Sequence, residues 1–173
     1  TGTYERRGVT ATTSPSMDIQ ISSNFERLLF EASERDSSAV RQMMAAFKQS
    51  GSFTIAGKPL AAIQKNFLAG RSNLAETADM IGLMLKSNGY LIDPHTAVGF
   101  KVARETALAS PMVVLSTAHP AKFPDAVKAA SGIVPALPAH LADLMQRNER
   151  LTRLSSDIKQ VQQYISRHTR ARA

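Results

Sequence analysis

Apolar residues recur at helical spacing along most of the chain, and good helix caps stand between the apolar series. Ser23 and Glu26 have the spacing of a capping box, and glycines follow several of the series. Asp93 is followed by Pro94, and a proline at the first helical position loses no hydrogen bond. This helix is expected to run to about Ala109. The predicted helix starts are Ser23, Asp36, Lys58, Asn73, Asp93 and Pro124.

Three short segments between the predicted helices favour strands. Residues 52–55 alternate polar and apolar side chains, whereas residues 90–92 and 112–115 are short apolar runs. Strands that alternate with helices indicate a layered architecture with parallel pairing. The expected fold class is therefore α/β, rich in helix and with short parallel strands.

The C-terminal part of the chain has a different pattern. Residues 135–138 contain two prolines and form a break, after which apolar residues recur at helical spacing from Leu141 to Ile165. We therefore expect residues 1–134 to form the main body of the domain. Residues 135–173 are expected to be a linker and a long C-terminal helix of the same domain.

The composition narrows the classes of function. The 173 residues include no cysteine, which excludes disulfide scaffolds and thiol catalysis. There is no apolar run long enough to cross a membrane and no basic-then-apolar leader, so we expect a cytoplasmic protein without a membrane partner. The four histidines lie far apart in the sequence, and we expect no metal site.

The formal net charge of +7 raises the alternative of a basic nucleic-acid-binding module or a helical interaction module with no catalysis. A nucleic-acid module would interleave basic and aromatic residues on one face. Here seven basic and two acidic residues fall within residues 147–173, so most of the excess charge belongs to the predicted C-terminal helix. We interpret this charge as a solvated helix face and expect no nucleic-acid partner.

Three polar segments are candidates for chemistry, namely residues 14–27, 93–99 and 115–123. The last two each follow a predicted strand, and ligands in open α/β sheets bind beyond the carboxyl ends of strands. Free N–H groups at the helix start near Ser23 would suit a phosphate. Each segment also has a purely structural interpretation as a cap or a turn, and the residues alone leave both interpretations open.

Together the three segments resemble threonine synthases of the microbial and fungal long form. The matching motifs are Ser-Pro-Ser-Met-Asp-Ile with Ser-Ser-Asn-Phe-Glu-Arg, then Asp-Pro-His-Thr-Ala-Val-Gly, then Ser-Thr-Ala-His-Pro-Ala-Lys-Phe-Pro. The likeness extends from about Thr3 to about Arg167. It implies the fold of the tryptophan-synthase β-like enzymes, with this chain as the C-terminal part of their large three-layer αβα domain.

The resemblance also implies an activity and partners. The family converts O-phospho-L-homoserine and water to L-threonine and phosphate with pyridoxal 5'-phosphate. The Schiff-base lysine and the loop that binds the cofactor phosphate would lie in a missing N-terminal part of the same enzyme. The chain would then be a fragment with no catalytic residue of its own, inactive when alone. Lys122 follows the ring-binding loop and is not the Schiff-base lysine.

Site residues follow from the same resemblance. Thr117 matches the position whose hydroxyl faces the pyridine nitrogen of the cofactor, and Ser116 and His119 would shape the same wall. A neutral hydroxyl at that place would not hold the nitrogen protonated. His95 and Thr96 would lie near the substrate by motif match. The residues expected around the substrate and its phosphate are Ser22, Ser23, Asn24 and Arg27.

Overall fold

The computed structural model describes residues 1–106 and 110–169. The chain divides into two compact units, Thr1–Ala136 and Leu137–Ala173. The boundary expected from the sequence lies after residue 134, next to this division. Among the described residues, no helix has both the length and the apolar character that crossing a bilayer requires.

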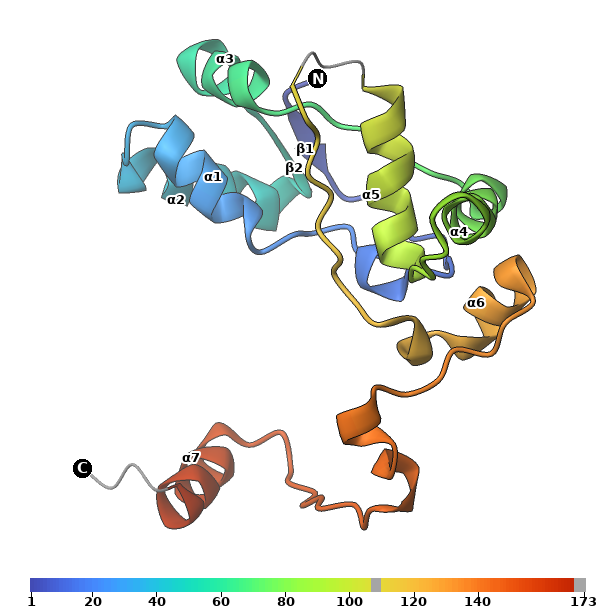
Figure 1. Ribbon diagram of the computed structural model, residues 1–173. Coiled ribbons are helices and arrows are strands. Elements are labelled where there is room, and N and C mark those ends of the chain that lie inside the picture. The colour runs from blue at the N-terminus through green and yellow to red at the C-terminus, as the bar shows by residue number, and fades with distance from the viewer. Residues whose placement is uncertain (107–109, 170–173) are drawn as a thin grey trace. The chain divides into compact units, whose positions relative to one another are not determined.

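The first unit contains most of the regular structure (Figure 1). Its helices are α1 (Phe25–Ala32), α2 (Ser37–Ser50), α3 (Gly57–Asn66), α4 (Leu74–Asn88), α5 (Pro94–Glu105) and α6 (Pro124–Ser131). Its strands are β1 (Thr3–Glu5) and β2 (Ser52–Thr54), and its short 3-10 turns are Pro15–Met17 and Pro120–Lys122.

Most of the predicted helix starts are confirmed. Asn73 and Glu76 form a complete capping box, and Asp36 accepts hydrogen bonds from the first turn of α2. The capping box predicted at Ser23 is wrong, because α1 begins at Phe25 after Asn24. Asn24 already has helical backbone angles, and a side chain caps a helix from an extended backbone instead. No side chain therefore caps the first turn of α1.

The described strands form one antiparallel pair, β1 with β2, in which Tyr4 lies opposite Phe53. Tyr4 is the centre of an aromatic group, with ring centroids 5.1 Å from Phe25, 5.2 Å from Phe47 and 5.1 Å from Phe53. Gly2 has a φ of +82°, and a Cβ there would lie 2.5 Å from the carbonyl oxygen of the residue after β2. The start of the pair therefore requires a glycine.

The parallel strands predicted at residues 90–92 and 112–115 are wrong. Both segments are extended, but neither pairs with a strand of the described residues. Ile92 is 1% exposed and packs between helices, whereas Val113 and Leu115 are 82% and 75% exposed. An apolar run predicts burial but does not supply the partner whose hydrogen bonds define a strand.

Two apolar cores support the first unit. One joins α1, α2, α3 and the strand pair around the fully buried Leu29, together with Phe47, Phe53 and Ile55. The other joins α4, α5 and α6, and its buried members are Met80, Ile81, Ile92 and Ala97. The second core places the start of α5 in the interior of the unit.

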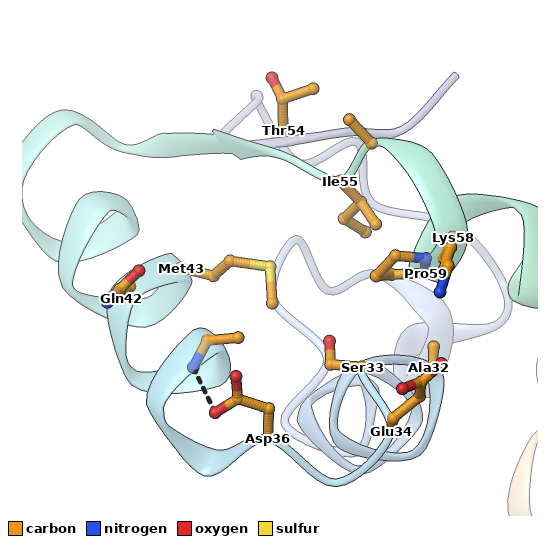
Figure 2. Close-up of a pocket in the computed structure, with 12 residues that line it drawn as sticks. Ala32, Ser33, Glu34, Asp36, Gln42, Met43, Thr54, Ile55, Lys58 and Pro59 are labelled. Carbon is orange, nitrogen blue, oxygen red and sulfur yellow. Dashed lines mark hydrogen bonds between the residues drawn. The ribbon is translucent and has the colours of Figure 1, made fainter.

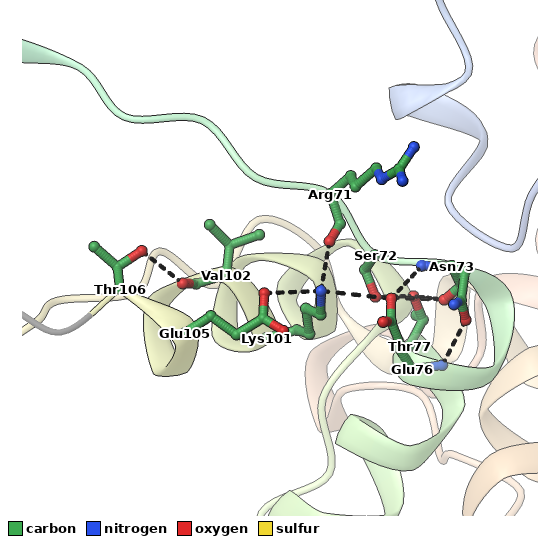
Figure 3. Close-up of polar contacts among 9 residues, drawn as sticks. All are labelled: Arg71, Ser72, Asn73, Glu76, Thr77, Lys101, Val102, Glu105 and Thr106. Carbon is green, nitrogen blue, oxygen red and sulfur yellow. Dashed lines mark hydrogen bonds and ion pairs between the residues drawn. The ribbon is translucent and has the colours of Figure 1, made fainter.

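Lys101 ties α5 to the start of α4 (Figure 3). Its Nζ lies 2.8 Å from a carboxylate oxygen of Glu105 and 3.5 Å from one of Glu76, and it donates a hydrogen bond to the carbonyl oxygen of Arg71. The hydrogen bond to Glu105 raises the pKa of Lys101. The N–H of Asn73 is the main cause of the lowered pKa of Glu76. Both groups are therefore charged at neutral pH and hold the two helices in register.

α5 ends at Glu105, and the predicted end at Ala109 lies outside the described residues. In its described part, residues 137–169, the second unit contains the short turns Ala139–Leu141 and Leu144–Gln146 and one helix, α7 (Ile158–His168). The long helix predicted from Leu141 to Ile165 is wrong. Asp157 caps α7 by accepting the N–H of Gln160, so the helix starts anew there. Helical periodicity does not distinguish one long helix from separate short ones in phase.

Candidate functional site

Asp93, at the start of α5, is a fully buried carboxylate. It is the N-cap residue that the sequence predicts, and its Oδ1 accepts the backbone N–H of His95 at 2.9 Å. Its Oδ2 accepts the backbone N–H of Thr96 at 3.3 Å. Pro94 occupies the first helical position, where no N–H is needed. Both oxygens have further partners in the side chains of His95 and Thr96.

The His95 ring joins Asp93 to the first of the three polar segments. Its Nδ1 lies 3.0 Å from Oδ1 of Asp93, and its Nε2 accepts the backbone N–H of Ser16 at 3.2 Å. Nε2 is therefore unprotonated and Nδ1 donates to the carboxylate. The ring is 5% exposed and packs against Phe123, with the ring centroids 4.6 Å apart.

The Thr96 side chain joins Asp93 to the third segment. Its hydroxyl donates a hydrogen bond to Oδ2 of Asp93 and accepts the backbone N–H of Thr117 at 3.2 Å. The structure thus brings the three polar segments together at one place. We call Asp93, His95 and Thr96 the α5 cluster.

The segment that leads to Thr117 is extended and largely exposed. Residues 111–119 run along α5 toward the short turn before α6 (Figure 1). The segment passes close to the helix at Gly99, where a Cβ would lie 3.2 Å from a methyl group of Val114. Ser116, Thr117 and His119 are all exposed, and Nδ1 of His119 accepts the N–H of Ala121 at 3.2 Å.

A cavity of about 480 Å³ lies between this segment and α5. Thr117 and His95 both line it, and most of the other lining side chains are apolar. Those other residues are Met17, Asn66, Leu68, Gly99, Val102, Ala103, Thr106, Met112, Val113, Val114 and Leu115.

The four residues predicted around the substrate phosphate lie at the start of α1. Ser22, Ser23, Asn24 and Arg27 are exposed, and in the described part of the chain none of them lines the 480 Å³ cavity. Nη1 of Arg27 donates to Oδ1 of Asn24 at 2.8 Å. The N–H of Ser22 donates to the hydroxyl of Tyr4 at 3.1 Å, which fixes this segment to the aromatic group.

A second cavity, of about 410 Å³, contains none of the predicted site residues. It lies beside α2, and the side chains of Met43 and Ile55 point into it (Figure 2). Asp36 at its edge is occupied in capping α2. Metal binding has no candidate in residues 1–106 and 110–169, because no group of three His, Cys, Asp or Glu side chains gathers there.

Sequence reasoning missed the two groups that connect the segments. Asp93 is predicted only as a cap, although its carboxylate is buried and accepts hydrogen bonds from four donors. Ser16 belongs to a matched motif, but it contacts His95 through its backbone N–H. A backbone contact of this kind cannot be predicted from the residue type. The presence of His and Thr directly after the cap is the pattern that could have pointed to a network.

Comparisons with known proteins agree with the three motifs. The family model described as "Threonine synthase, C-terminal" matches residues 96–165. The threonine synthase of Pseudomonas aeruginosa is 45% identical over 168 residues, which are 95% of this chain and 36% of that protein. The threonine synthase of Saccharomyces cerevisiae is 39% identical over 145 residues, 73% of this chain and 28% of that protein.

Solved structures give the same likeness. A crystal structure of threonine synthase from Brucella melitensis with bound PLP is 63% identical and has a TM-score of 0.86, over 98% of this chain and 37% of that one. The yeast threonine synthase structure is 32% identical with a TM-score of 0.76, over 95% of this chain and 38% of that one. These matches confirm the α/β class and the fold expected from the motifs, and none of them supports a nucleic-acid module.

Proposed function

Because this chain belongs to the threonine synthase family and corresponds to its C-terminal part, we propose that it forms one wall of a pyridoxal-phosphate site that makes L-threonine. The substrate would be O-phospho-L-homoserine, and the products L-threonine and phosphate. The chain spans 36% of the Pseudomonas aeruginosa relative and 37% of the Brucella melitensis structure. The observation that carries the proposal is that Thr117 and His95, from two of the matched motifs, line one cavity.

The residues of this cavity fit the ring of pyridoxal phosphate. A volume of about 480 Å³ is within the usual range for small-molecule sites, and its lining is mostly apolar with a few polar groups. The Thr117 hydroxyl would meet the pyridine nitrogen, with Ser116 and His119 beside it. When bound, the cofactor supplies an electron sink for carbanions of the substrate. A neutral hydroxyl there would leave that nitrogen unprotonated and so would moderate the sink.

The start of α1 would receive the substrate phosphate. Arg27 is a fixed cation whose guanidinium is exposed and already oriented by Asn24. The first turn of α1 has no side-chain cap, and its positive dipole end would favour an anion. The N–H groups of Phe25 and Arg27 already donate to the carbonyl oxygens of Ser22 and Asn24. Ser22 and Ser23 would add hydroxyl donors. His95 and Thr96 would lie between this substrate region and the cofactor ring.

The partner of this chain would be the N-terminal part of the same enzyme, which holds the Schiff-base lysine. By the same resemblance, Lys122 would not be that lysine, because it follows the ring-binding loop. Its Nζ lies 5.9 Å from the centre of the Phe123 ring. This chain would bind and orient the cofactor ring and the substrate, and the lysine of the N-terminal part would move the protons. We expect the enzyme to act in the cytoplasm, without metal, membrane or nucleic acid.

A chimera tests this function. The region of Pseudomonas aeruginosa threonine synthase that matches this chain is replaced by the chain itself, and phosphate release and threonine formation are measured with pyridoxal phosphate present. We expect the chimera to turn over O-phospho-L-homoserine. The 173-residue chain alone and the truncated relative alone are expected to form no threonine. An inactive but folded chimera, or threonine made by the isolated chain, would contradict the proposal.

Matched arginine variants of the chimera test the phosphate region. Loss of a charge-assisted hydrogen bond in Arg27→Ala should raise KM for O-phospho-L-homoserine about tenfold or more. Arg35→Ala removes an exposed arginine that pairs with Glu31 near the other end of α1, and it should leave KM unchanged. Equal KM values for the two variants would place the substrate phosphate elsewhere.

A further inference from the structure

Within the described residues 110–118, the hydrogen bond between Thr96 and Thr117 is the single polar attachment of a long, mostly exposed segment. Among the described residues, the N–H of Thr117 is the one group of residues 110–118 that makes a hydrogen bond. In the same segment, the side chain of Val114 approaches α5 closely at Gly99. Rotation of the Thr117 peptide is therefore controlled by one acceptor, the Thr96 hydroxyl.

That acceptor is itself held in one orientation. A hydroxyl has one proton to donate, and Thr96 donates it to the buried carboxylate of Asp93. Because this proton is engaged with Oδ2 of Asp93, a lone pair of the Thr96 oxygen faces the Thr117 N–H. Asp93 is 0% exposed and Thr96 1% exposed, so water does not compete for these groups.

The same carboxylate also fixes the neighbouring segment. His95 bonds to Oδ1 of Asp93 on one side and receives the N–H of Ser16 on the other. The His95 ring packs on Phe123, at the far end of the loop that contains Thr117. The α5 cluster thus holds both ends of this loop relative to α5.

We propose that Thr96 is a positioning residue that, oriented by Asp93, sets the Thr117 peptide and with it the hydroxyl at the cofactor ring. The proposal rests on the proposed function for its catalytic consequence. In this role Thr96 acts from the interior without touching the substrate. Replacement of Thr96 by valine removes the hydroxyl and keeps the shape of the side chain, whereas replacement by serine keeps the hydroxyl. The two variants therefore form a matched pair.

Amide hydrogen exchange of the 173-residue chain tests the link directly. In Thr96→Val the Thr117 N–H loses its acceptor, and its exchange should become about tenfold faster, as expected for the loss of one hydrogen bond. Thr96→Ser keeps the hydroxyl and should stay within about twofold of the unchanged chain. The amide of Phe47, in the other core, should not change in either variant. Thr117 exchange that is unchanged in Thr96→Val, or raised equally in both variants, would overturn the proposal.

The chimera gives the catalytic readout. Thr96→Val should lower kcat about tenfold or more, since small misplacements at a reacting centre are costly, while KM for O-phospho-L-homoserine changes less than about threefold. The near-visible absorbance of the bound cofactor should shift in Thr96→Val, and Thr96→Ser should restore both kcat and absorbance. A matching loss in the serine variant would assign Thr96 a merely structural role. An inactive unmodified chimera would refute the proposed function, and the exchange data would still decide the positioning role.

Discussion

Replacement of Asp93 by alanine is expected to lower the free energy of unfolding of the chain by about 3–5 kcal/mol. The variant removes a fully buried carboxylate and leaves four donors without an acceptor, two backbone N–H groups and the side chains of His95 and Thr96. Urea unfolding followed by far-UV circular dichroism measures the change. It is the largest single-residue effect that the polar groups of the structure predict.

Asp36→Ala is the matched control for Asp93→Ala. Asp36 is also a helix N-cap and accepts the N–H groups of Ser38 and Ala39, but it is exposed. Its loss should cost about 1 kcal/mol, the usual value for a cap. The excess in Asp93→Ala over Asp36→Ala measures the buried network. If the two variants lose equal stability, Asp93 is an ordinary cap and the α5 cluster adds nothing further to the free energy of unfolding.

Leu29→Ala is expected to destabilise the chain by about 2–5 kcal/mol. Leu29 is 0% exposed in the core that joins α1, α2 and β2, so truncation leaves a cavity in addition to the lost apolar contacts. The same urea titration measures it. Leu74→Ala, at a residue that is 53% exposed, should change stability by less than about 0.5 kcal/mol. A loss below about 1 kcal/mol for Leu29→Ala would contradict a packed first core.

Several local features of the fold were predictable from the sequence, and the strand pairing that depends on distant partners was not. Asn73 with Glu76 forms a cap from residues of its own helix, so the pattern sufficed. The apolar run at residues 112–115 is typical of a buried strand. A strand requires a hydrogen-bonded neighbouring strand, however, and none is found for this segment in the described residues. The prediction of one long C-terminal helix failed for a different, local reason, because Asp157 starts a new helix within a continuous apolar period.

The candidate site follows the same division. The motifs pointed to Thr117, His95 and Thr96, and the structure brings these three together. The connection itself depends on the burial of Asp93 and on the backbone N–H groups of Ser16 and Thr117, none of which can be read from residue identity. The predicted roles of all these residues, and of Ser116, His119 and the residues at the start of α1, stay predictions.

The most direct test of the account is a crystal structure of the chimera with bound pyridoxal phosphate. The central claim is that this chain presents the Thr117 hydroxyl to the pyridine nitrogen, held by Thr96. We predict a distance of about 2.6–3.2 Å between the Thr117 hydroxyl oxygen and that nitrogen, with the Thr117 N–H still bonded to Thr96. A pyridine nitrogen that faces another residue, with the Thr117 hydroxyl beyond hydrogen-bond reach, would contradict it.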